Sequence, residues 1–327
     1  MMYARTRRTL PCLTAGLIAL GSIVSGCGDS GIEVIDRTID LPGTVLFSSD
    51  RSGGWKVYMS NFNSTLYTAV TSTVSGEQKE AVWHPDGMGV YFTTEVGSSW
   101  RIATIDDVSN ASATFQVLTD TTGQQTKPAV SSDGTRLAFL NLLPTSEVPD
   151  LWIMDLTTGD YEFLVAGLNT QEMKFVPGST DLLVLDGNHL KVVDTDTGVV
   201  TQFAFDTEKD AAFRHASFNF GAGGEVFCSG LEINRELYTL GLFDYNDPVE
   251  IERLTEGSRA LVNSWLDLSS FRIDGEDFLL IAGTPSSGGF ENRVGLIKVD
   301  TGEYLILFMR FMSGNNRWPE WTSVEHF

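Results

Sequence analysis

The chain consists largely of short runs in which apolar and polar residues alternate, with turn-forming residues between the runs. Residues 47–61, FSSDRSGGWKVYMSN, contain an apolar run, a charged glycine-rich turn and a strictly alternating run. Successive side chains of a β-strand point to opposite faces, so this period of two predicts strands with one buried face. The pattern leaves little room for long helices. The chain is therefore predicted to be all-β.

Hairpin-like units recur along the chain after this first stretch. Each unit pairs two strand-like runs across a turn. The units span residues 80–94, 127–141, 172–186, 215–230 and 262–283. A third alternating run follows each of them, at residues 100–106, 150–156, 189–195, 236–244 and 293–300. Edge-like fourth runs come next, such as 115–120 and 161–165. Four strands per unit is typical of a propeller blade.

An aromatic or branched residue precedes each turn, at intervals of about 45 residues. These positions are Trp83, Val130, Phe175, Phe218 and Trp265, and Trp321 in RWPEWTS continues the series. No further strands follow Trp321, whereas the first hairpin lacks an innermost strand. We therefore predict that strand 318–323 pairs with strand 44–49. This pairing would close a six-bladed β-propeller with four-stranded blades and leave no free sheet edge at the junction.

The N-terminus has the pattern of a lipoprotein signal. Residues 1–9 contain three arginines and no acid, about 12 mostly apolar residues follow, and the sequence VSGC ends at Cys27. This apolar stretch is shorter than the roughly 20 residues that span a bilayer. We expect residues 1–26 to be a signal peptide, Cys27 to carry the lipid, residues 27–41 to form a lipidated tether and residues 42–327 to form the propeller.

The expected address is the cell envelope, with the membrane as a partner through the lipid anchor. Gly28, rather than aspartate, follows the cysteine. This is typical of lipoproteins that reach the outer membrane, where they face the periplasm or the cell surface. The formal net charge is −21, and the signal peptide removes only basic residues. Such a surface repels nucleic-acid phosphates, so no nucleic-acid partner is expected.

Cysteine usage excludes a disulfide within the mature chain. Cys12 leaves with the signal peptide and Cys27 is acylated, which leaves Cys228. Cys228 lies in the apolar strand pattern EVFCSG, so we expect it to pack in the core.

Several stretches resemble the TolB-like, WD40-like β-propeller repeat. The resemblance extends over residues 44–327 and is carried best by Ser49-Asp50-Arg51-Ser52-Gly53, Trp83-His84-Pro85-Asp86-Gly87 and Pro319-Glu320-Trp321, with a weaker match at Pro128 and Ser132-Asp133-Gly134. The fourth to sixth blades depart from the motif through VPGST, FGAGG and DLSSFRIDG. The family's eponym is a soluble periplasmic protein with an additional N-terminal domain that binds a peptidoglycan-associated lipoprotein. Here the signal leads almost directly into the propeller, so that role is not carried over.

Catalytic motifs are not evident in the sequence. It contains no G-x-S-x-G nucleophile elbow, and its four histidines, His84, His189, His215 and His326, lack metal-ligand spacing. No metal and no cofactor are expected. DTDTG (194–198) reads as a hairpin turn rather than a calcium loop, because DLTTG (155–159) repeats it. We expect a scaffold that binds a protein or ligand and is not an enzyme. The alternative is a carbohydrate-active enzyme (glycoside hydrolase or lyase) or a peptide-processing enzyme on the same frame.

A binding site is predicted in the central channel, which the innermost strands line. Strand alternation places Val82, Ala129, Lys174, Ser217, Ser264 and Glu320 at one level, and Glu80, Lys127, Glu172, His215, Val262 and Trp318 nearer the mouth. We select Glu80, Lys127, Glu172, Lys174, His215, Trp318 and Glu320 as the tunnel-mouth residues. Their mixed charges suit an envelope protein, a peptide terminus or a small polar ligand. The alternatives are that the charges only pair with one another, and that Trp318 packs against a neighbouring blade rather than stacking on a ligand.

Overall fold

The structure is a computed structural model that describes residues 41–62, 67–203, 213–232, 237–248, 251–254, 262–285, 293–300, 303–306 and 315–326. The predicted signal peptide, Cys27 and all but the last residue of the predicted tether lie outside the described residues. None of the helices in the described ranges has both the length and the apolar character that crossing a membrane requires.

The described residues form six antiparallel four-stranded sheets, which are the blades of a propeller. From the innermost strand outward, blade 1 contains β24 (Asn316–Thr322), β1 (Thr44–Ser49), β2 (Lys56–Asn61) and β3 (Thr68–Ala69). Blade 2 contains β4 (Gln78–Trp83), β5 (Val90–Val96), β6 (Ser99–Ile105) and β7 (Phe115–Val117). Blade 3 contains β8 (Gln124–Val130), β9 (Arg136–Leu142), β10 (Asp150–Asp155) and β11 (Tyr161–Val165).

The second half of the chain repeats the arrangement. Blade 4 contains β12 (Thr170–Phe175), β13 (Leu182–Asp186), β14 (His189–Val193) and β15 (Val200–Gln202). Blade 5 contains β16 (Phe213–Phe220), β17 (Glu225–Glu232), β18 (Leu237–Asp244) and β19 (Glu252–Arg253). Blade 6 contains β20 (Val262–Ile273), β21 (Glu276–Pro285), β22 (Arg293–Lys298) and β23 (Glu303–Ile306). A 3-10 turn, η1 (Val108–Asn110), and the short α1 (Ala111–Thr114) connect β6 to β7.

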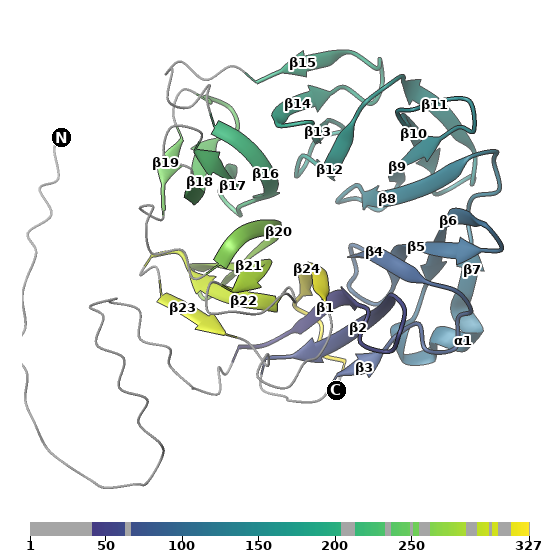
Figure 1. Ribbon diagram of the computed structural model, residues 1–327, viewed down its shortest axis with the longest axis horizontal. Helices are drawn as coiled ribbons and strands as arrows, with labels where there is room; N and C mark the ends of the chain where they lie inside the picture. The colour runs from purple at the N-terminus through teal and green to yellow at the C-terminus, as the bar shows by residue number, and fades with distance from the viewer. Residues whose placement is uncertain are drawn as a thin grey trace, which may run out of the picture. The chain divides into compact units, whose positions relative to one another are not determined.

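The blades follow one another in a closed ring (Figure 1). Contacts between neighbouring blades join β1 to β4, β5 to β8, β8 to β12, β12 to β16, β16 to β20 and β20 to β24. The C-terminal strand β24 pairs antiparallel with β1, with Thr44 opposite Thr322 and Ser49 opposite Asn316. The predicted six-bladed, four-stranded architecture and its closure by the C-terminal strand are therefore confirmed.

The turn of the first hairpin secures the closing strand. Asp50 accepts hydrogen bonds from the backbone N and the side-chain Nδ2 of Asn315, at 2.7 and 2.9 Å. Arg51 donates through Nη2 to Oδ1 of Asn316 at 2.6 Å, and its guanidinium lies 4.7 Å from the ring centre of Tyr58. These contacts link residues 265 positions apart in the sequence. Asp50 and Arg51 of the Ser-Asp-Arg motif therefore hold the C-terminal strand against the first hairpin.

Apolar cores lie between neighbouring blades. Trp83 packs with Leu46 in the cluster between blades 1 and 2. Trp321 stacks on Phe271 of blade 6, with ring centres 4.7 Å apart. Cys228 is fully buried in the cluster between blades 4 and 5, and its packing in the core was predicted from its sequence pattern. Burying each large side chain of this kind contributes about 1.5–3 kcal/mol.

The DTDTG segment forms a hairpin turn between β14 and β15. Asp194 accepts hydrogen bonds through Oδ1 from the backbone N of Asp196 and Thr197, at 2.9 and 3.0 Å. Gly198 has a φ of 72°. Asp155 makes the equivalent bonds to Thr157 and Thr158 in blade 3. The carboxylate therefore caps the turn, and the predicted hairpin turn is confirmed.

Candidate functional site

The innermost strand of every blade contains a β-bulge or register irregularity, and these irregularities shape the channel wall. In three blades the bulge contains a non-glycine residue with positive φ: Glu80 at 56°, Lys127 at 56° and Trp318 at 50°. L-residues rarely adopt this conformation. A bulge re-aims a side chain and interrupts strict alternation. Consecutive residues of one strand, such as Glu80, Ala81 and Val82, therefore all reach the channel wall.

A cavity of about 420 Å³ lies in the channel. Residues of β4, β8, β12, β16, β20 and β24 line it, so it lies on the axis of the ring. Six of the seven predicted tunnel-mouth residues line this cavity: Glu80, Lys127, Glu172, Lys174, Trp318 and Glu320. Four side chains in its wall are acidic and three are basic.

In blade 5, the prediction of the residue that lines the channel is wrong by one position. His215 is only 3% exposed and its neighbour Ala216 lines the cavity in its place, because the register of β16 shifts between His215 and Ser217. Ser217 is fully buried as well. Strict alternation predicted this part of the wall incorrectly because it takes no account of bulges.

In blade 6 the wall comes from Asp267 and Leu268. Strand alternation selected Val262 and Ser264, whose side chains lie outside the described residues. β20 extends for 12 residues to a two-residue turn at Asp274 and has two register shifts. Asp267, and Arg317 beside Trp318, are site residues that the sequence analysis missed.

A second cavity of about 440 Å³ adjoins the first along the channel. Both cavities are lined by Val82, Met173, Lys174 and Glu320. Lys174 Nζ forms an ion pair with Glu320 Oε1 at 2.5 Å. This pair therefore lies at the junction of the two cavities.

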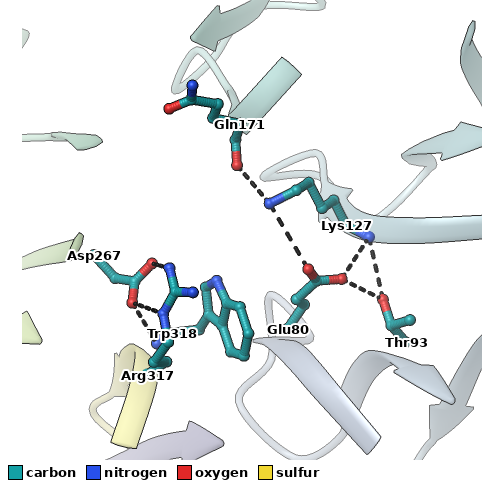
Figure 2. A network of polar contacts seen from close by, with 7 residues as sticks. All are labelled: Glu80, Thr93, Lys127, Gln171, Asp267, Arg317 and Trp318. Atoms are coloured by element: carbon teal, nitrogen blue, oxygen red, sulfur yellow. Dashed lines mark hydrogen bonds and ion pairs between the residues drawn. The ribbon is translucent and has the colours of Figure 1, made fainter. Parts of the chain in front are cut away.

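The other two bases of the cavity also pair with acids (Figure 2). Lys127 Nζ lies 3.7 Å from Glu80 Oε1 and donates to the carbonyl oxygen of Gln171 at 2.5 Å. Arg317 binds Asp267 through two parallel bonds of 3.1 Å each. Each of the three basic side chains of the cavity therefore forms an ion pair with an acidic side chain, as the alternative in the sequence analysis anticipated.

Three carboxylates of the cavity also accept hydrogen bonds from the backbone of the next blade. The pairs are Glu80 Oε2 with Lys127 N at 3.1 Å, Glu172 Oε2 with Phe218 N at 3.0 Å, and Asp267 Oδ2 with Trp318 N at 3.2 Å. They join blades 2 and 3, blades 4 and 5, and blades 6 and 1. Lys127 and Trp318 lie in bulges, which free backbone N–H groups from the strand ladder, and the carboxylates of Glu80 and Asp267 satisfy these groups.

The environments of the ionisable groups differ. Burial disfavours the charge of Glu80, but Lys127, Lys79 and hydrogen bonds outweigh it, so its pKa is lowered. Burial raises the pKa of Glu172 to about 7, and Lys174 offsets only part of this effect. Burial also disfavours the charge of Lys174, but Glu320 and Glu172 outweigh it and raise its pKa. Glu172 therefore keeps its proton to a higher pH than an exposed glutamate does.

Trp318, which lines the cavity, packs against a second tryptophan ring. Trp318 lies 5.4 Å from Trp55 between ring centres, and the Arg317 guanidinium lies 4.4 Å from the Trp318 ring. Trp55 belongs to the β1–β2 connection of the same blade. Trp318 therefore both packs against protein groups and forms part of the cavity wall.

Comparisons with known proteins give similarity in fold only. No protein-family model matches the sequence, and no curated protein matches it. TolB from Acinetobacter baumannii superimposes with a TM-score of 0.67 at 18% identity, over 85% of this chain and 66% of that chain. A chain of the nidogen/laminin complex superimposes with a TM-score of 0.64 at 13% identity, over 85% of this chain and 98% of that chain. An oligogalacturonate lyase in complex with manganese gives 0.56 at 13% identity, over 83% and 75%.

It was wrong to conclude from the sequence that this protein is not an enzyme. The lyase is an enzyme and its chain covers most of this propeller at fold level. A fold hosts both binding proteins and enzymes, so missing motifs do not exclude catalysis. Within the described residues, no group of three or more histidine, cysteine or acidic side chains is arranged to hold a metal ion.

The chain spans about two thirds of the TolB chain that it resembles. The shared part is the propeller itself, with four-stranded blades arranged in a ring. The protein therefore has the fold of the TolB-like six-bladed β-propellers.

Proposed function

We propose that this protein is a lipid-anchored protein of the bacterial cell envelope whose propeller binds a partner protein, peptide or small polar ligand in the channel cavity. One observation carries the proposal. All six blades contribute to a cavity of about 420 Å³ whose wall contains both charge signs, next to Trp318. Ligand pockets typically measure about 300–1,000 Å³ and combine apolar walls with a few placed polar groups.

The frame around this cavity favours recognition. The carboxylate-to-backbone bonds between blades hold the lining side chains in place. A preformed site loses little conformational entropy when it binds. The nidogen/laminin structure, which has a similar propeller fold, is a complex of two named proteins.

The anchor proposal rests on the sequence. Three arginines, an apolar stretch and VSGC at residues 24–27 support acylation at Cys27, and Gly28 supports transport to an outer membrane where the organism has one. A single acyl chain binds membranes only marginally, so two or three chains on the cysteine are needed for stable anchoring. Cys27→Ser should move the protein from the membrane to the soluble fraction. A variant that remains in the membrane would contradict the anchor.

Capture of partners from detergent-solubilised envelope tests the binding site. Lys127→Glu breaks the ion pair with Glu80 and the hydrogen bond to the carbonyl oxygen of Gln171, which together shape the mouth, and should remove a partner that wild type retains. Lys298→Glu is the matched control, because it also breaks an ion pair, with Glu276 on the β20–β21 hairpin, away from the cavity. Equal capture by wild type and Lys127→Glu would overturn the binding proposal.

Catalysis is a second candidate because of Glu172. A carboxyl group with a pKa of about 7 in a cavity wall is suited to exchange protons with a substrate at neutral pH. The masses of the captured molecules should therefore be measured by mass spectrometry before and after incubation with the wild-type protein, and in parallel with the Glu172→Gln variant. Cleavage by wild type alone would support catalysis. Unchanged masses would leave binding as the function.

A further inference from the structure

The cavity contains one acid more than it contains bases. Its four acidic side chains are Glu80, Glu172, Asp267 and Glu320, and its three basic side chains are Lys127, Lys174 and Arg317. The ion pairs join Lys127 to Glu80, Lys174 to Glu320 and Arg317 to Asp267. Among the described residues, none forms an ion pair with Glu172.

Glu172 is held in the wall without a compensating charge of its own. Its Oε2 accepts a hydrogen bond from Phe218 N at 3.0 Å. The nearest cation along the strand, Lys174, is committed to Glu320 at 2.5 Å. Asp267 from β20 adds a second negative charge to the surroundings of Glu172. An enclosed carboxylate in such surroundings is stabilised when an opposite charge arrives.

We infer that the ligand of this cavity presents a basic group, such as a lysine or arginine side chain or a free amine, that pairs with Glu172. This inference rests on the proposed binding function and names the ligand class of the same site. The raised pKa of Glu172 agrees with it, since a partly buried carboxyl without an ion-pair partner holds its proton until a cation replaces it.

The apolar part of the wall fits the stem of such a group. Met173, Ala216 and Leu268 line the cavity together with Glu172. Lysine and arginine side chains bury their methylene stems against apolar surface while the charged end reaches a polar group. The net charge of −21 also attracts cations to the protein from a distance.

Two blocked peptides that differ in one charge test the inference. The probes are acetyl-Gly-Ser-Lys-Ser-Gly-amide and the same peptide with norleucine, which keeps a similar aliphatic stem and lacks the ammonium group. Dissociation constants are measured by NMR titration of the full mature propeller at about 0.15 M salt, where long-range attraction is screened. We expect the lysine peptide to bind wild type at least tenfold more tightly than the norleucine peptide.

Three variants assign this preference to one carboxylate. Glu172→Gln keeps an oxygen that accepts from Phe218 N and removes the charge, so the lysine preference should fall below threefold. Glu172→Asp keeps the charge and should retain part of the preference. Glu162→Gln removes an equal charge from an exposed position on the outer strand β11 and should leave it unchanged.

Equal affinities of the two peptides for wild type, no detectable binding of either peptide, or a preference that persists in Glu172→Gln would each overturn the inference. These failures are distinct from failure of the proposed function. If Lys127→Glu removes a captured partner while the peptides show no lysine preference, the cavity binds a ligand of another class. If Lys127→Glu leaves capture unchanged, the binding function itself fails.

Discussion

Lys174 and Glu320 form an ion pair across the propeller channel, with Nζ and Oε1 2.5 Å apart although 146 positions separate them in the sequence. Lys174 belongs to β12 of blade 4, and Glu320 belongs to the closing strand β24. Their side chains are 18% and 21% exposed, so most of the pair is removed from water. Ser269 of β20 also donates to Glu320 at 3.3 Å. The pair therefore connects three blades at the junction of the two cavities.

Removal of Lys174 should destabilise the propeller. Lys174→Met leaves Glu320 in the channel without its ion-pair partner and removes the nearest positive charge from Glu172, and breaking a mostly buried pair in this way costs about 2–4 kcal/mol. Lys298→Met is the control, since its partner Glu276 is 46% exposed and such a pair contributes about 1 kcal/mol or less. Urea denaturation measures both free energies of unfolding. Equal losses would show that the channel pair contributes no more than a surface pair.

Much of the architecture was predictable because propeller blades repeat local chemistry. The Asp86-Gly87 and Asp133-Gly134 turns and the alternating runs locate strands, and the incomplete first and last units together require closure. Hydrophobic alternation is strong where one face of a strand is buried, so it located the inner strands of the blades, whereas the short outermost strands of blades 4 to 6 were not located.

The channel wall was less predictable, because a bulge shifts the faces of a strand without a strong sequence signal. Alternation located Glu80 and Lys127 correctly but selected His215 where Ala216 lines the cavity. Two bulges have one visible signal, a proline that follows Lys127 or Trp318. The pairing of charges across the ring depends on distances between blades, which no sequence period encodes.

The stability of the propeller should depend on pH through Glu172. Its folded-state pKa is raised to about 7, above the unfolded value near 4.3, by burial and by Asp267, against the effect of Lys174. The folded state therefore binds more protons than the unfolded state between about pH 4.3 and 7. Stability from this group is fully present below that window and falls as the pH rises through it.

Glu172→Gln removes this dependence. The free energy of unfolding of the variant relative to wild type should rise by about 3 kcal/mol from pH 4.5 to pH 8, because the pKa difference between the folded and unfolded states corresponds to about 1.4 kcal/mol per unit. Urea denaturation at both pH values gives the comparison, and Glu162→Gln on the surface should show little change. A difference between Glu172→Gln and wild type that is the same at both pH values would contradict the raised pKa.

Gly87 makes the close approach of the C-terminal segment possible. Its φ is 72°, and a Cβ at this position would overlap Oγ1 of Thr322 and lie 2.7 Å from Cγ2 of Val324. Gly87→Ala should therefore cost about 1 kcal/mol for the backbone and a further 1–3 kcal/mol for the overlap.

Gly97→Ala separates these two effects. Gly97 has a similar φ of 66° and nothing within 4 Å of its Cβ position, so only the backbone cost of about 1 kcal/mol applies. Thermal unfolding of the two variants measures the difference. If both midpoints fall by the same amount, the contact of the closing segment with the β4–β5 turn contributes nothing to stability.

Lys127 combines a side chain at the cavity with a backbone conformation that favours glycine. Its φ is 56°. An L-amino acid in this left-handed backbone conformation lowers the stability of the fold by about 1–2 kcal/mol. Lys127→Gly and Lys127→Ala both remove the ion pair with Glu80, and only the alanine keeps a Cβ. Lys127→Gly should therefore be more stable than Lys127→Ala by about 1 kcal/mol. At Lys79 on β4, whose φ is not positive, the order should reverse, because glycine weakens an ordinary strand. Urea denaturation of the four variants at pH 7 gives both comparisons. If the Lys127→Ala variant is as stable as Lys127→Gly, the backbone of the bulge stores no strain. The only consequence of the bulge would then be the direction in which it points the lysine side chain.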